Sequence, residues 1–175
     1  KCLYLQRYDL INMPVLKKIV ISDFRNIELQ EIEFSPNVNC ISGNNGEGKT
    51  NLLDAIYYLS MTKSAFASSD RYVLRHGAAE FALAGTYVME SGLESKFALK
   101  STSKGEKKVR RDDKPYPKIS EHIGVLPVVI VSPSDVSMVS ESGEERRRFV
   151  NAVLSQMSPE YMAAMQQYNR LLLQR

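Results

Sequence analysis

One octapeptide constrains the fold of this chain more than any other part of its sequence. It consists of Gly43, Asn44, Asn45, Gly46, Glu47, Gly48, Lys49 and Thr50, which match the pattern G-x-x-x-x-G-K-[ST] of a phosphate-binding loop. Glycine tolerates positive φ and has no side chain, so such a loop can turn its backbone N–H groups toward a phosphate. We expect Lys49 to reach the β- and γ-phosphates of a nucleotide and Thr50 to offer its hydroxyl to Mg²⁺.

The residues that flank this octapeptide give it the setting that the motif requires. Residues 38–42 predict a short buried strand, in which Cys40 is a small core residue. Residues 51–60 predict a helix, because apolar side chains recur on one face: Leu52, Leu53, Ile56 and Leu59. The N-terminus of that helix, the positive end of its dipole, would point at the bound anion. Strand, loop and helix together predict a nucleotide-binding site.

The composition excludes several classes of protein. The chain has 175 residues, of which 43% are hydrophobic and 25% charged, as expected for one globular domain. No apolar run is long enough to span a membrane. The net charge of +3 permits a nucleic-acid partner without arguing for one. Two cysteines are too few for a disulfide framework or a metal site, so we expect a reducing, cytoplasmic setting.

The remaining apolar pattern predicts an α/β chain with a mixed sheet. Strands are expected at residues 16–22 and 27–34, and a slip in the alternation of the second predicts a bulge there. Period-two alternation at residues 81–88 and 96–100 predicts an antiparallel pair joined by a hairpin turn. Residues 124–131 form the most apolar stretch and predict a central strand buried on both faces.

Two helices are predicted toward the end of the chain. Ser142 and Glu145 form a capping-box pattern that begins the first helix. Ser158 and Pro159 are typical N-cap and first-turn residues, and they begin the second. The apolar pattern of the second helix is still running at residues 171–173, and no helix-ending residue follows, so we expect a fragment of a longer protein.

Hydrolysis of ATP needs groups beyond the phosphate loop, which hold Mg²⁺ and orient the attacking water. The usual acid, called Walker B, follows a strand of apolar residues. After residues 128–131 the nearest acid is Asp135, which lies behind a Ser-Pro-Ser turn and matches poorly. We therefore expect these residues to bind nucleotide and to hydrolyse it very slowly.

Two basic clusters are candidates for contact with DNA. The first lies in the charged run at residues 104–118 and comprises Lys107, Lys108, Arg110 and Arg111. This run can equally be a solvated hairpin tip, and Asp112 and Asp113 weaken its positive charge locally. The second cluster comprises Arg146, Arg147 and Arg148, in a first helical turn, where positive charge opposes the helix dipole. It contacts either DNA or a protein partner, or it forms a solvated helix face beside Glu144 and Glu145.

Several segments resemble, in the same order, those of a known family. Residues 22–26 (S-x-F-R-N) and the stretch 39–56 resemble the N-terminus of ABC-type ATPase heads of the SMC/Rad50/RecF class. The further segments 57–60, 131–135, 145–149 and 154–159 and the later Tyr168 extend this resemblance to the RecF family of bacterial DNA replication and repair proteins. The resemblance covers the chain from Met13 to Arg175. It rests on the whole set of segments in the same order, because the phosphate loop alone is common to the entire superfamily.

This resemblance implies a P-loop ABC-type ATPase head with an antiparallel β subdomain, followed by the start of a helical lobe. It implies ATP and Mg²⁺ as cofactors, with Arg25 touching a nucleotide phosphate. It also implies an ATP-dependent homodimer that binds double-stranded DNA near single-strand gaps and works with RecO and RecR to load RecA. Family members are about twice as long, and their signature motif and Walker B acids lie in the second half, so weak ATPase activity is expected only of the full-length protein.

The domain boundaries follow from the same reasoning. We expect residues 1–12 to be a leader foreign to the natural protein, which would begin at Met13; the alternative is a genuine N-terminal extension. Residues 13–140 are expected to form the nucleotide-binding lobe, and residues 141–175 the truncated start of the helical lobe.

Two other interpretations stay open. The chain can be part of another SMC/Rad50-like head that acts mainly as a nucleotide-gated DNA clamp or scaffold. A small-molecule kinase with the same loop is a weaker alternative, because the expected antiparallel strands after the helix differ from the βα units of such kinases.

Overall fold

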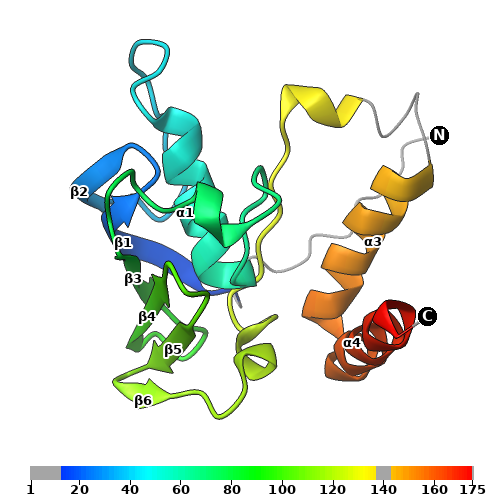
Figure 1. Ribbon diagram of the computed structural model, residues 1–175. Helices are drawn as coiled ribbons and strands as arrows, with labels where there is room; N and C mark the ends of the chain where they lie inside the picture. The colour runs from blue at the N-terminus through cyan, green and yellow to red at the C-terminus, as the bar shows by residue number, and fades with distance from the viewer. Residues whose placement is uncertain (1–12, 137–142, 175) are drawn as a thin grey trace, which may run out of the picture.

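The computed structural model of the protein describes residues 13–136 and 143–174 (Figure 1). The expected leader, residues 1–12, and the capping residue Ser142 lie outside the described residues. The described part of the chain consists of one sheet, a helix packed against it, and a pair of helices further along the chain.

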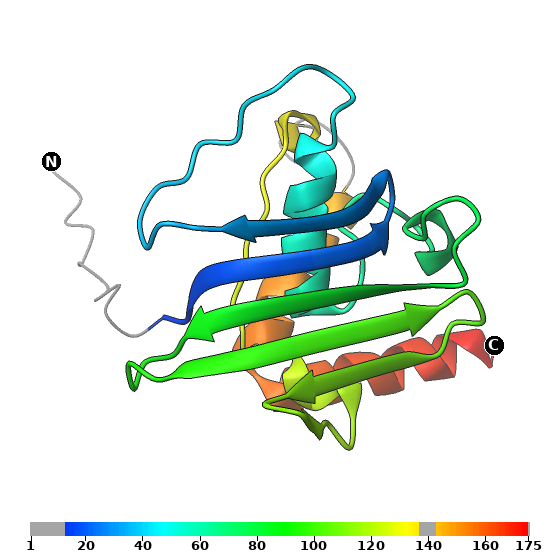
Figure 2. The same ribbon diagram turned by 90° about the vertical axis from the view of Figure 1, so that its left-hand side faces the viewer.

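The sheet has six strands in the order β2-β1-β3-β4-β5-β6, and every neighbouring pair is antiparallel. The strands are β1 (Val15–Phe24), β2 (Ile27–Glu33), β3 (Glu80–Val88), β4 (Glu94–Thr102), β5 (Lys107–Arg111) and β6 (Lys114–Pro115). Figure 2 shows one face of the sheet turned to the viewer, with the helices behind it. Within the described residues, the helices therefore cover one face only, and the opposite face is open.

Four predicted strands are confirmed, as is the hairpin turn between β3 and β4. The predicted bulge in β2 is wrong, because its pairing with β1 is regular from Ile27 to Glu33. The irregularity lies instead in β1, between Leu16 and Lys18, where the register against β3 shifts. The apolar residues of β2 change their alternation for another reason. Because β2 lies at the edge of the sheet, an apolar side chain such as Leu29 can remain 72% exposed.

The core forms where α1 (Lys49–Met61) packs on the covered face of the sheet. Phe24, Tyr58 and Phe81 meet edge to face, with ring centroids 5.2 to 5.8 Å apart. A β-carbon on Gly85 of β3 would lie 2.6 Å from Leu59 Cδ2, so glycine is what lets α1 approach the sheet this closely. This packing fixes the orientation of α1 and hence of its N-terminus, which the phosphate loop precedes.

Two predicted strands are wrong. Residues 38–42 and 124–131 contain no strand, and Cys40 is exposed instead of buried in the core. Val129 and Val131 are 62% and 77% exposed. The physical reason is that no strand in the described ranges lies beside either segment, and a strand is stable only where a neighbour pairs with its N–H and C=O groups. The parallel part of the predicted mixed sheet is therefore not formed by the described residues.

Five further helices complete the described part of the chain. They are α3 (Gly143–Met157), α4 (Pro159–Leu173) and the short 3₁₀ helices η2 (Asp70–Tyr72), η3 (Ile119–His122) and η4 (Pro133–Val136). The predicted N-cap of α4 is confirmed, since the Ser158 hydroxyl accepts the N–H of Tyr161 at 3.1 Å. Within the described ranges, no helix is both long and apolar enough to cross a membrane.

Candidate functional site

The phosphate loop adopts the backbone that its glycines permit. Gly43, Gly46 and Gly48 have φ values of 151°, 86° and 102°, a region that other residues rarely occupy. Gly48 forms the left-handed N-cap of α1, which therefore begins at Lys49 as the motif requires. A β-carbon on Gly46 would meet nothing within 4 Å, so open space lies against this part of the loop. The geometry fits a cradle that a phosphate group can enter.

The charged side chains of the loop are bound to the loop itself. Lys49 Nζ donates to the carbonyl oxygens of Gly43 at 2.7 Å and Asn44 at 2.6 Å, which holds the amino group across the mouth of the loop. Glu47 accepts the side-chain amide and the backbone N–H of Asn44, both at 2.7 Å. These hydrogen bonds, the side-chain one first, hold the pKa of Glu47 below its usual value. A bound phosphate would therefore compete with Glu47 for the N–H of Asn44.

Two asparagines outside the motif lie at the loop, where Asn26 contacts the loop itself and Asn51 contacts Asn26. The sequence interpretation missed both as site residues. Asn26 donates from Nδ2 to the carbonyl oxygen of Gly46 at 3.3 Å. Asn51, in the first turn of α1, donates to Asn26 Oδ1 at 2.7 Å. No spacing rule connects Asn26 with a loop some twenty residues away. The only signal was its place beside Arg25 in the segment that resembles the ATPase heads.

The structure places Arg25 in a polar network with α1 and the segment that follows it. Its Nε donates to Asp54 Oδ2 at 2.8 Å, and its Nη2 lies 2.6 Å from the same oxygen and 3.1 Å from the hydroxyl of Ser64. Asp54 is fully buried and also accepts the N–H of Ala65 at 2.8 Å. The contact of Arg25 with a phosphate stays a prediction. A carboxylate inside the apolar pattern of α1 was the available signal for this network.

The structure splits the basic residues of β5 between the two faces of the sheet. Lys107 lies over the ring of Tyr58 and pairs with Asp70 at 2.7 Å, and Arg111 lies over the ring of Phe97. Both rings belong to the core, so these two cations are on the covered face. Lys108 and Arg110 alternate with them and are exposed on the open face. The four residues predicted as one basic edge are thus two pairs with different surroundings.

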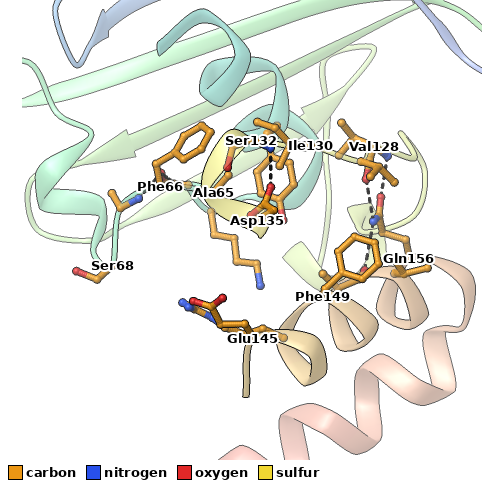
Figure 3. Close-up of a pocket in the computed structure, with 18 of the residues that line it drawn as sticks. Ala65, Phe66, Ser68, Val128, Ile130, Ser132, Asp135, Glu145, Phe149 and Gln156 are labelled. Carbon is orange, nitrogen blue, oxygen red and sulfur yellow. Dashed lines mark hydrogen bonds between the residues drawn. The ribbon is translucent and has the colours of Figure 1, made fainter. Parts of the chain in front are cut away.

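The second basic cluster lies at the start of α3 beside a cavity of about 800 Å³ (Figure 3). The cavity is bounded by the loop after α1, by residues 128–135 and by α3, and Arg148 is among the residues that line it. Gln156 lies on one side of the cavity. Its side-chain oxygen accepts the N–H of Val128 at 2.8 Å, and its side-chain nitrogen donates to the C=O of Val128 at 3.1 Å (Figure 3). Gln156 thereby takes the place that a neighbouring strand would have.

The expectation that the site binds Mg²⁺ rests on one residue of the chain, Thr50. Thr50 is exposed at the start of α1, directly after Lys49. Within residues 13–136 and 143–174, no group of three or more His, Cys, Asp and Glu side chains is placed to hold a metal ion. The Thr50 hydroxyl fits one part of such a site, in which a loop Ser or Thr, an acid and the phosphates of the nucleotide together hold Mg²⁺.

Comparison with known proteins agrees with this geometry. A family model described as an AAA domain matches residues 18–169. DNA replication and repair protein RecF of Phocaeicola vulgatus is 42% identical over 161 residues, which are 92% of this chain and 43% of the relative. RecF of Porphyromonas gingivalis is 43% identical over 92% of this chain and 44% of its own length. The chain thus spans less than half the length of these curated relatives.

Solved structures give the same result for the fold. The recombination mediator protein RecF bound to ATP superposes with a TM-score of 0.86 at 29% identity, over 94% of this chain and 44% of that protein. An SMC ATPase superposes with a TM-score of 0.66 at 19% identity over 79% of this chain, which is a likeness of fold alone. The fold is that of an α/β ABC-type ATPase head, and the resemblance to RecF is confirmed. By its phosphate loop, its fold and these relatives, the chain belongs to the AAA domain family, in which it is similar to the RecF proteins.

Proposed function

We propose that this chain is the ATP-binding part of a RecF-type protein of DNA replication and repair. The observation that carries the proposal is the glycine cradle at residues 43–48, which leads directly into α1 and has the amino group of Lys49 across its mouth. The similarity to RecF, including the form bound to ATP, supports ATP as the nucleotide.

Each group in the site has a distinct task in this proposal. The loop N–H groups and the N-terminus of α1 bind the phosphates. Lys49 leaves the carbonyls of Gly43 and Asn44 and neutralises the β- and γ-phosphates. Thr50 offers its hydroxyl to Mg²⁺, which would lower the negative charge of the phosphates. Arg25, held by Asp54, adds positive charge beside the loop. The proposal includes weak ATPase activity in the full-length protein only.

The test is ATP binding measured with a fluorescent nucleotide. Replacing Lys49 by Ala should raise the Kd for ATP at least about 100-fold, because a charge-assisted contact with phosphate is lost. The matched control is Lys17→Ala, which removes an exposed lysine paired with Glu94 at 2.6 Å and should leave the Kd unchanged. Unchanged affinity in Lys49→Ala would reject the proposal.

The proposal extends to double-stranded DNA near single-strand gaps, an ATP-dependent homodimer, RecO and RecR as partners, help in loading RecA, and a cytoplasmic location. RecF structures described as part of a RecFOR pathway support the partners by analogy. For DNA, the open face of the sheet offers Lys108 and Arg110, and α3 offers Arg146, Arg147 and Arg148. The open face favours Lys108 and Arg110 over Lys107 and Arg111, which contact core rings.

Charge reversal tests the DNA contacts. Changing all three arginines of α3 to Glu should abolish DNA binding by the intact protein and spare ATP binding. Lys108→Glu with Arg110→Glu should flatten the dependence of log K on log salt by about 0.9 for each lost phosphate contact. Lys107→Ala is the control that should leave this slope unchanged. An unaltered slope and affinity in both charge reversals would reject these contacts.

The alternative, an SMC-like nucleotide-gated clamp, has the shared fold in its favour. RecF is favoured over it because the RecF structure superposes with the higher TM-score, 0.86 against 0.66, and with the higher sequence identity, 29% against 19%. The antiparallel pairing of β1, β3 and β4 around α1 speaks against a small-molecule kinase.

A further inference from the structure

The turn between β1 and β2 lies against the phosphate loop, although the two are distant in sequence. Phe24 pairs with Ile27 across this turn, and both side chains are buried in the core. Arg25 adopts a left-handed conformation with φ 54°, and its N–H donates to the carbonyl of Val73 at 2.7 Å. The backbone of Asn26 is therefore held from both sides, and its exposed side chain projects from a rigid base.

The amide of Asn26 contacts both the loop and the first turn of α1. Nδ2 donates to the carbonyl of Gly46 at 3.3 Å, and Oδ1 accepts from Asn51 at 2.7 Å. Above Gly48, a β-carbon would lie 2.9 Å from Oδ1 and 3.1 Å from Nδ2. The side chain occupies the space that any other residue at position 48 would need, so Gly48 serves the approach of Asn26 as well as its own φ of 102°.

This contact determines where the next N–H of the loop points. In a trans peptide the C=O and the following N–H point in opposite directions. With its carbonyl bound to Asn26, the Gly46–Glu47 peptide must turn the N–H of Glu47 away from Asn26. That N–H indeed lies on the other side, 3.5 Å from the carbonyl of Asn44, which is a weak hydrogen bond that a phosphate oxygen could replace.

We propose that Asn26 is a positioning residue of the nucleotide site, which holds the Gly46–Gly48 segment with its N–H groups turned toward the phosphates. The inference rests on the proposed ATP binding and names a residue outside the motif on which that binding depends. Asparagine suits the task because one planar amide supplies both the donor for Gly46 and the acceptor for Asn51. Aspartate would keep the acceptor, lose the donor and bring negative charge to the phosphates.

The experiment measures the Kd for ATP and the thermal stability of the nucleotide-free protein for four variants. Asn26→Ala should weaken ATP binding about tenfold, as expected for loss of a hydrogen bond that organises the loop. Asn26→Asp should weaken it further, and high salt should reduce this extra loss. Asn39→Ala is the matched control, because the side-chain amide of Asn39 makes two hydrogen bonds to the backbone of Ser35 and does not contact the loop. The Kd of this variant for ATP should be that of the wild type. Lys49→Ala gives the reference for lost binding.

The order of the two Asn26 variants separates positioning from a merely structural role. If Asn26 only stabilised the turn, Asp would be the milder change, because it keeps the shape and the bond to Asn51, and ATP affinity would follow thermal stability. That result, or wild-type affinity in both variants, would overturn the inference. A wild-type protein that fails to bind ATP at all would instead overturn the proposed function, so the two failures are distinguishable.

Discussion

Two regions of the molecule have similarly apolar sequences and different structures. The first is the sheet with α1, and the second consists of the segments at residues 38–42 and 124–131. In the sheet, alternating residues such as Ile19, Ile21 and Phe81 are at most 1% exposed. In the two segments, Val38 and Val131 are 89% and 77% exposed. The difference teaches that an apolar pattern becomes a buried strand only where neighbouring chain satisfies its backbone and covers its side chains.

The largest expected effect tests this contrast directly. Phe81→Ala should lower the free energy of unfolding by about 4 kcal/mol, because it leaves a cavity between the rings of Phe24 and Tyr58. Val131→Ala should change it by less than about 0.5 kcal/mol, as for an exposed site. Chemical denaturation of both variants measures the two values. A loss at Val131 close to that at Phe81 would show that the two regions are equally buried.

A somewhat smaller effect is expected where the sheet meets the site. Asp54→Ala should lower the free energy of unfolding by about 3 kcal/mol, because it leaves the partly buried guanidinium of Arg25 without its carboxylate. The control is Glu28→Ala, which removes an exposed partner of Arg75 2.7 Å away and should change stability by about 0.5 kcal/mol or less. Equal effects in the two variants would contradict a buried role for Asp54.

The smallest effect concerns His122, which is buried against α1 and lies just before the segment at residues 124–131. Burial lowers the pKa of His122 from 6.5, and the opposing hydrogen bond to the carbonyl of Leu59, at 2.7 Å, is the smaller cause. The unfolded chain therefore binds a proton below pH 6.5 that the folded chain does not bind until its lower pKa is reached. The free energy of unfolding should fall with decreasing pH across this window, with a slope of up to about 1.4 kcal/mol per pH unit.

Replacing His122 by Gln isolates this contribution. The difference between the stability curves of His122→Gln and the wild type, measured by denaturation between about pH 5 and 8, should carry the pH dependence assigned to the imidazole. Parallel curves over that range would show that His122 does not titrate differently in the folded and unfolded chain.

Local patterns sufficed for much of the fold and for the centre of the site. The loop, the start of α1, the antiparallel strands and the Ser158 cap follow from rules that act within a few residues. The failures have one physical origin. The strands at residues 38–42 and 124–131 needed a neighbour, and the phase of β2 depended on its place at the edge of the sheet.

The sequence by itself determined that residues 43–50 form a phosphate loop ahead of a helix, because glycine φ freedom and the spacing to Lys49 are local properties. Only the tertiary structure decided that Asn26 contacts this loop, that Asp54 holds Arg25, and that Lys107 lies over the ring of Tyr58. These contacts join residues far apart in the chain. They exist because the burial of the core brings the β1–β2 turn, α1 and β5 together, and no local pattern encodes which of their side chains then meet.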